Sequence, residues 1–92
     1  MNREIDNYLL YKNLPSIDIH GEDRVGAKIK IEVFIKENYI LKNKFLLIIH
    51  GKGTGTLKNT TKKVLKENKL VKDYKLDIFN PGVTIVELKQ EH

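Results

Sequence analysis

A glycine-rich turn between an apolar run and a lysine-rich segment constrains the fold of this chain more than any other feature. Residues 45–49 are five consecutive apolar residues, and residues 48–57 read IIHGKGTGTL. A short uninterrupted apolar run is typical of a strand buried in a parallel sheet. Glycine tolerates positive φ and lets the backbone approach a ligand closely. The three glycines therefore predict a tight turn from this strand into a helix: Gly51, Gly53 and Gly55.

A glycine turn that opens a helix is suited to binding an anion. The first N–H groups of a helix have no partner within the helix, and they lie at the positive end of its dipole. We therefore expect a phosphate-binding site that includes Gly51, Gly53, Thr54 and Gly55. The alternative is that the glycines only end the strand and the threonines cap the helix, with no ligand bound.

A second histidine–glycine pair follows another short apolar run. Residues 16–21 read SIDIHG, so His20 directly follows one predicted strand, just as His50 directly follows the other. If the two strands are parallel neighbours, both histidines lie at the carboxyl edge of the sheet, where open α/β folds bind ligands. A single histidine in such a turn is more often structural. The pair favours proton transfer, for which imidazole is well suited near neutral pH.

These blocks resemble the two signatures of the Smr, or small MutS-related, domain family, Asp-Leu-His-Gly and His-Gly-x-Gly-Thr-Gly. Residues 18–21 read DIHG, with isoleucine in place of leucine, and residues 50–55 read HGKGTG. Residues 82–88, GVTIVEL, are similar to the last strand of the family, so the resemblance spans residues 14–88. The chain resembles a stand-alone member of the family, because Met1 lies close to the domain and position 20 is histidine. Domains fused to the second bacterial MutS lineage often carry arginine at that position.

Length and composition predict one small domain. A chain of 92 residues with 40% hydrophobic content can build one core but not two. We expect a tail or docking segment over residues 1–13 and an Smr-like domain over residues 14–92. No apolar run approaches the roughly twenty residues that a bilayer-spanning helix needs, and no secretory pattern opens the chain, so we expect a cytoplasmic protein without a membrane partner. The lack of cysteine excludes disulfides and thiolate zinc sites.

Positive charge is concentrated in the second half of the chain. Residues 42–75 contain ten lysines against Glu67 and Asp73, whereas the whole chain has a net charge of +5. On the helix expected after the glycine turn, four lysines share one face: Lys58, Lys62, Lys66 and Lys69. A lysine-rich helix face usually only contacts solvent. Because this one is near the glycine turn, we interpret it as a surface that binds nucleic-acid phosphates. Tyr39 or Tyr74 could stack on bases, although their spacing does not require it.

The remaining pattern predicts four strands and two helices. The strands are expected at residues 16–19, 45–49, 74–79 and 84–88, with a tight turn at 80–82 and the second helix ending near Asn68. Residues 25–35 alternate like a strand. A parallel crossover between the first two strands nevertheless needs a dozen or more residues, usually helical, and the family resemblance also implies a helix, which Asp23 would cap.

As a helix, this crossover carries two apolar stripes. One stripe would pack on the sheet: Ala27, Ile31, Phe34 and Ile35. The other is left over: Val25, Ile29, Val33 and Ile40. We expect the N-terminal segment, or a second copy of the chain in a weak homodimer, to cover the second stripe.

The predicted fold is a two-layer α/β sandwich of order βαβαββ with a mixed four-stranded sheet. The Smr family shares this architecture with the C-terminal domain of bacterial translation initiation factor three. The resemblance also implies a nucleic-acid-binding domain, frequently an endonuclease that hydrolyses phosphodiester bonds in DNA or RNA.

Phosphodiester hydrolysis needs proton transfer, positive charge and groups that position the phosphate. Our hypothesis gives proton transfer to His20 and His50, and gives Lys52 the stabilisation of transition-state charge. Asp18 would orient an imidazole or bind a divalent ion such as magnesium. The alternative for Asp18 is a structural role as a hydrogen-bond acceptor in the turn after the first strand. Nucleic acid would bind along Gly51, Lys58, Lys62 and Lys66 as well. Metal dependence stays open, because one aspartate and two histidines make no diagnostic spacing.

Two other functions fit the same residues. A non-catalytic nucleic-acid-binding module would use the same basic face without cleavage. A nucleotide enzyme is suggested by the Gly-x-Gly-x-Gly pattern after a strand. That spacing differs from the dinucleotide and phosphate-loop motifs, however, and the chain is too short for a doubly wound cofactor domain.

Overall fold

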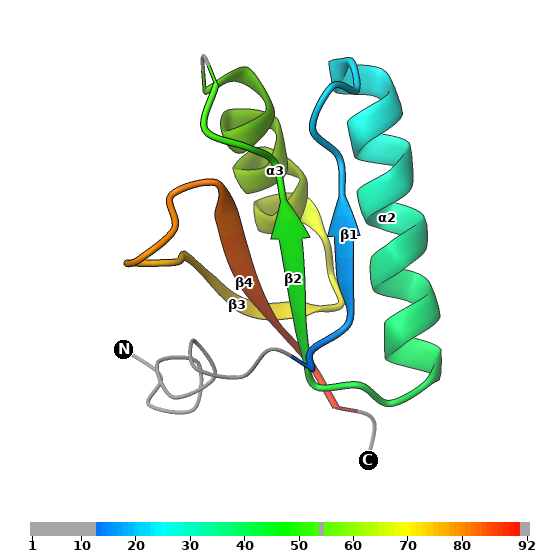
Figure 1. Cartoon of the computed structure of the whole chain (residues 1–92). Helices are drawn as coiled ribbons and strands as arrows, with labels where there is room; N and C mark the ends of the chain where they lie inside the picture. Colours follow the sequence, from blue (N-terminus) through cyan, green and yellow to red (C-terminus); the bar gives the residue numbers. More distant parts are fainter. Residues whose placement is uncertain (1–12, 54, 91–92) are drawn as a thin grey trace.

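The computed structural model describes residues 13–53 and 55–90 and has the predicted βαβαββ order. The elements are β1 (Ser16–Asp18), α2 (Arg24–Ile40), β2 (Phe45–Ile49), α3 (Thr56–Glu67), β3 (Val71–Leu76) and β4 (Val83–Leu88). The strands form one sheet in the order β1-β2-β4-β3, in which only the β1–β2 pair is parallel (Figure 1). Neither helix in the described part of the chain is long and apolar enough to cross a membrane.

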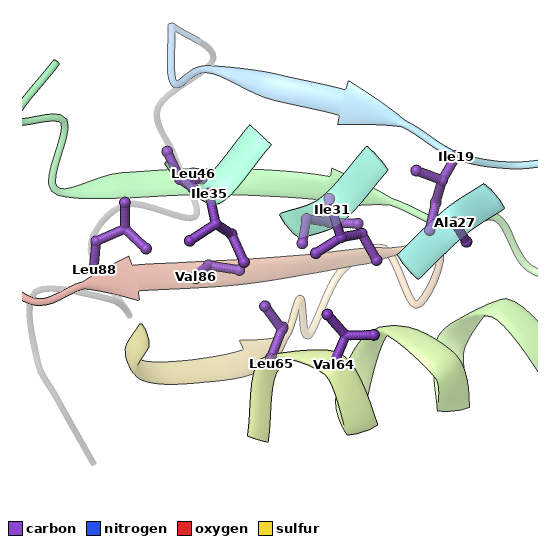
Figure 2. Close-up of a cluster of buried hydrophobic side chains, with 10 residues drawn as sticks. Ile19, Ala27, Ile31, Ile35, Leu46, Val64, Leu65, Val86 and Leu88 are labelled. Atoms are coloured by element: carbon purple, nitrogen blue, oxygen red, sulfur yellow. The ribbon is translucent and has the colours of Figure 1, made fainter. Parts of the chain in front are cut away.

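Both helices pack on the same face of the sheet and form one core with it. The helix side chains meet alternate residues of the central strands and the residue that follows β1 (Figure 2). The buried cluster consists of Ile19, Ala27, Ile31, Ile35, Leu46, Ile48, Val64, Leu65, Val86 and Leu88. This core fixes the starts of α2 and α3 against the carboxyl ends of β1 and β2. The predicted tail lies outside the described residues, apart from Asn13.

The crossover segment is the predicted helix, although its residues alternate like a strand. The carboxylate of Asp23 accepts a hydrogen bond from the backbone N–H of Gly26 at 2.6 Å, which caps α2 as expected. Helical geometry sorts the apolar residues by position: Ala27, Ile31 and Ile35 are buried, and Phe34 is half-buried. The connection between parallel strands therefore overrides the local strand pattern.

The second apolar stripe of α2 is exposed to solvent. Each of its four residues has more than half of its surface exposed: Val25, Ile29, Val33 and Ile40. The N-terminal segment that was expected to cover this stripe lies outside the described residues. Coverage by a second copy of the chain stays a prediction, and sedimentation equilibrium would test it as a concentration-dependent mass.

β3 was predicted over residues 74–79 but lies three residues earlier and ends at Leu76. The reason is a side-chain turn at Asp77. Its carboxylate accepts a hydrogen bond from the N–H of Phe79 at 2.9 Å, and its own N–H donates to the carbonyl of Val83 at 2.9 Å. The residues after Asp77 therefore form the connection to β4 instead of extending β3.

The predicted lysine face of α3 is shorter than expected. The helix ends at Glu67, and Asn68 is its C-terminal cap. Lys69 thus lies beyond the helix, and the prediction that placed it on the face was wrong. The other three lysines are exposed on α3: Lys58, Lys62 and Lys66.

Two isoleucines on α2 allow a matched test of this packing. Ile31 is fully buried, whereas Ile29 is 56% exposed, although a strand would place both on one face. We expect Ile31→Ala to lower the free energy of unfolding by about 2–5 kcal/mol, because it leaves a cavity in the core. Ile29→Ala should change it by about 0.5 kcal/mol or less. Urea denaturation of both variants measures the difference, and equal losses would contradict the helical assignment.

Candidate phosphate-binding site

The two histidine–glycine turns lie side by side at one edge of the sheet. β1 pairs in parallel with β2, with Asp18 opposite Ile49, and the N–H of Ile19 donates to the carbonyl of Ile49 at 2.8 Å. In Figure 1 both strand arrows point to the top of the molecule, where the following turns lie. A Cβ atom built on Gly51 would lie 3.4 Å from Cβ of His20. The parallel pairing therefore brings the turns together as the sequence pattern predicted.

These turns and the starts of α2 and α3 line a cleft of about 540 Å³, and its lining includes the acidic residues Glu22 and Asp23. The predicted site residues that line it are His20, His50, Gly51, Lys52, Gly53, Gly55 and Lys58. Asp18 contacts His20 from the end of β1, and Lys62 lines the neighbouring groove. Lys66 is exposed further along α3, and Thr54 lies outside the described residues. Most of the predicted residues thus share one concave surface.

The start of α3 differs from the start of α2 in how it is capped. The capping residue of α3 is Gly55, at φ 90°, so no side chain is available there to accept a hydrogen bond from the first turn. Neither a side-chain cap nor an acidic residue accompanies this first turn. The alternative in which a threonine caps α3 is therefore not observed in the described residues. The positive end of the helix dipole opens on the cleft, where an anion is favoured.

His20 is an exposed imidazole held by a neighbouring carboxylate. One oxygen of Asp18 accepts the backbone N–H of His20 at 3.0 Å and lies 2.8 Å from Nδ1 of the same residue. These hydrogen bonds, the backbone one first, lower the pKa of Asp18 below its ordinary value. A carboxylate acceptor holds the proton on Nδ1, which leaves Nε2 as the basic nitrogen. The side chain of His20 is 73% exposed, so Nε2 is within reach of a ligand in the cleft.

His50 is a buried imidazole whose two ring nitrogens both have partners. Nδ1 lies 3.2 Å from the carbonyl oxygen of Gly51, which can only accept, so Nδ1 carries the proton. Nε2 then accepts a hydrogen bond from the hydroxyl of Thr84 at 2.8 Å. Burial lowers the pKa of His50 below its ordinary value, and the positive charge of Lys58 acts in the same direction, whereas the Gly51 carbonyl opposes them. His50 is therefore neutral near pH 7.

Sequence analysis missed the residues that hold the His50 turn in place. The carbonyl of Gly82 accepts the N–H groups of both His50 and Gly51, at 2.9 and 3.0 Å. A Cβ atom on Gly82 would lie 3.2 Å from the backbone of Gly51, so a side chain there would require the two turns to shift apart by a few tenths of an ångström. The Asn-Pro-Gly turn could have indicated Gly82. No sequence signal indicated Thr84, because it acts from a strand thirty-four residues away.

The described residues contain no cluster of three or more metal-ligand side chains. No three histidine, cysteine, aspartate or glutamate side chains of the described ranges come together, although Asp18 and His20 are in contact beside the cleft. The predicted role of magnesium thus stays a prediction.

The burial of His50 gives the folded protein a pH-dependent stability. The unfolded chain binds a proton at His50 near its ordinary pKa of 6.5, whereas the folded chain binds it only at lower pH. The stabilisation is therefore present above about pH 6.5 and is lost as the pH falls below it. Urea denaturation between about pH 8 and pH 5 should show falling stability. The His50→Gln variant should lose that part of the pH dependence, and an unchanged slope would contradict this account.

Comparisons with known proteins support the family expected from the motifs. The profile of the Smr domain matches residues 17–89. The chain is 43% identical over 77 residues to Endonuclease MutS2 of Clostridium acetobutylicum, and 38% identical over 76 residues to Endonuclease MutS2 of Alkaliphilus metalliredigens. These matches cover 80% and 79% of this chain. The chain spans about a tenth of the length of those relatives.

Two solved structures have the same fold. The Smr domain of Thermus thermophilus MutS2 superposes with a TM-score of 0.80 at 26% identity, covering 83% of this chain and 99% of that one. YdaL, a stand-alone small MutS-related protein from Escherichia coli, superposes with a TM-score of 0.81 at 19% identity, covering 98% of this chain and 78% of that one. Stand-alone members thus exist, and a stand-alone architecture for this chain stays a prediction. The Smr profile matches most of the length of this chain, and both signatures lie at one cleft. This chain therefore belongs to the Smr domain family.

Proposed function

We propose that this domain binds a nucleic-acid phosphate in the cleft and hydrolyses a phosphodiester bond there. The observation that carries the proposal is the shared position of the exposed Asp18–His20 pair and the glycine-capped start of α3. The first supplies a base, and the second supplies a place for the phosphate. The names of the MutS2 relatives, which call them endonucleases, agree with this proposal.

His20 is the proposed catalytic base. Its Nε2 takes a proton from a water molecule as the water oxygen attacks phosphorus and the bond to the leaving sugar oxygen breaks. The leaving oxygen takes a proton from solvent in the open cleft. Asp18, 2.8 Å from Nδ1, keeps the ring in the required tautomer and orientation. Exposure supports this role, since proton exchange with solvent regenerates the base.

His50 has a different proposed role, although the sequence pattern gave both histidines proton transfer. Its side chain is 4% exposed, and both ring nitrogens have partners within the protein. A proton could leave or reach the ring only if one of those hydrogen bonds broke. We assign His50 to positioning: it ties the Gly51 turn to Thr84 on β4 and so holds the phosphate site in shape.

The remaining cleft residues would bind the phosphate and the strand that carries it. Lys52 is exposed on the glycine turn and would stabilise the negative charge that develops on the non-bridging oxygens. Backbone N–H groups of Gly53 and Gly55 would position the phosphate. The nucleic acid would continue along α3 over the lysine face: Lys58, Lys62 and Lys66.

Replacement of His20 tests the catalytic assignment. We expect His20→Ala to lower cleavage of labelled single-stranded RNA, duplex DNA or branched DNA by about 100-fold or more, because a positioned base contributes about that much. Asp18→Asn should lower it less, since the base remains but loses its orientation. Cleavage is measured with magnesium and with EDTA, so that metal dependence is found in the same experiment. Unchanged cleavage by folded His20→Ala protein rejects the assignment.

The same assay separates an enzyme from a binding module. Wild-type protein that binds these substrates without cleaving them, with magnesium or with EDTA, would favour the non-catalytic alternative. Binding should then survive His20→Ala, because that change removes no lysine from the face of α3.

Charge reversal on α3 tests the binding track independently of cleavage. Changing Lys58, Lys62 and Lys66 to glutamate should weaken binding strongly. The remaining binding should depend less steeply on salt, by about 0.7–0.9 in the logarithmic slope for each phosphate that a lysine no longer neutralises. Fluorescence anisotropy at several salt concentrations measures both effects.

The matched control for this charge reversal lies on and just beyond α2. It changes Lys28, Lys36 and Lys42, which are exposed there, to glutamate. This control has the same net charge as the α3 variant but should retain most of the affinity. Equal weakening of both variants would mean that only net charge matters.

A further inference from the structure

A second groove continues from the cleft along the side of α3 that faces β3. It measures about 500 Å³ and lies between α3 and β3. Its lining residues are Lys58, Asn59, Lys62, Tyr74, Lys75, Leu76 and Thr84. Lys58 lines both the cleft and the groove, and Thr84 is the hydrogen-bond partner of His50 in the wall between them. A strand bound in the cleft can therefore extend into this groove.

The groove combines an aromatic side chain with a basic rim. Tyr74 is half-buried and packs against the core cluster, which restrains its ring while part of it lines the groove. Leu76, the next residue on the same face of β3, is 38% exposed beside it. Lysines from α3 and β3 border these two side chains. An apolar surface bordered by positive charge matches a nucleobase with phosphates on either side.

Charge distinguishes this groove from the larger one between α2 and α3. That groove, about 820 Å³, is lined by Glu32 and Glu67 as well as by basic residues. The lining of the α3–β3 groove includes three lysines and no carboxylate. The positive lining of the α3–β3 groove therefore favours a polyanion, with no lining carboxylate to oppose it. Tyr39, the other tyrosine considered for stacking, lies near the end of α2 and lines neither the cleft nor this groove.

We propose that the α3–β3 groove holds an unpaired nucleotide, with its base stacked on Tyr74 and its flanking phosphates bound by Lys58 and Lys62. This inference rests on the proposed function and names its substrate class: a single strand, or an unpaired stretch next to the bond in the cleft. A base within a duplex has both faces covered by its neighbours, so it cannot stack on a side chain without leaving the helix.

An oligonucleotide without bases separates stacking from phosphate binding. The probes are a fluorescein-labelled thymidine DNA strand of about twelve nucleotides and an abasic strand of equal length, which carries the same phosphates. We expect wild-type protein to bind the thymidine strand about tenfold more tightly, the scale of one stacked base. Tyr74→Leu should remove this preference and keep the affinity for the abasic strand. Tyr74→Phe should retain the preference, because the ring remains.

Phe79 provides the matched control. It is 76% exposed on the connection between β3 and β4, and it lies outside the lining of the groove. Phe79→Leu should leave the preference for bases unchanged. A preference that disappears in Phe79→Leu and persists in Tyr74→Leu would move the stacking site to that connection and overturn the proposal. Thermal denaturation confirms that each variant is folded.

Wild-type protein alone decides the proposal if Tyr74→Leu does not fold. Equal affinity for the thymidine and abasic strands would overturn stacking in the groove and leave the proposed function intact. Binding of neither strand, nor of duplex or branched DNA and RNA, would mean that the proposed function itself is wrong. Tighter binding of a duplex than of the thymidine strand, at equal phosphate number, would also overturn the unpaired substrate class.

Discussion

Parallel pairing of β1 with β2 is the constraint on which the whole site depends. Because the two strands run in the same direction, their carboxyl ends and the turns that follow share one edge of the sheet. The pairing in turn requires a long crossover, which α2 supplies, and α2 needs the sheet to bury one of its apolar stripes. A chain that paired these strands in the opposite direction would place His20 and His50 at opposite ends of the sheet. The core and the cleft therefore have a common origin in one strand pair.

The sequence was most informative where local pattern and topology agreed. The apolar run at β2, the glycine turn and the capping aspartate of α2 each have a local physical cause, and each was predicted. β3 was misplaced because Ile78 and Phe79 look like strand residues. The side chain of Asp77 begins a turn before them, and the composition of the segment does not show that competition. The end of α3 near Asn68 was predicted correctly, but Lys69 was wrongly placed on the helix face because it continues the lysine spacing beyond the cap.

The different environments of the two histidines were not predicted, because both follow a short apolar run and precede a glycine. The two turns are adjacent, but they differ in their partners. Thr84 and Gly82 bind the His50 turn, whereas His20 follows the edge strand β1 and has Asp18 as its partner. Burial thus makes one imidazole a neutral part of the architecture, and exposure leaves the other able to exchange protons. The proposed stacking role of Tyr74 could not be predicted from its sequence context either, because it depends on β3 lying beside α3.

In the proposed mechanism, reactivity and folding depend on different residues of this cleft, because His20 is exposed. Its contacts are with Asp18, two residues before it, and they involve no part of the core. Substitutions at position 20 can therefore change the chemistry of the cleft while the fold persists, whereas substitutions at position 50 must also satisfy Thr84 and Gly51. In the proposed mechanism, a protein built on this scaffold would therefore lose or alter its activity by changing the side chain at position 20, and would keep the proposed phosphate-binding surface.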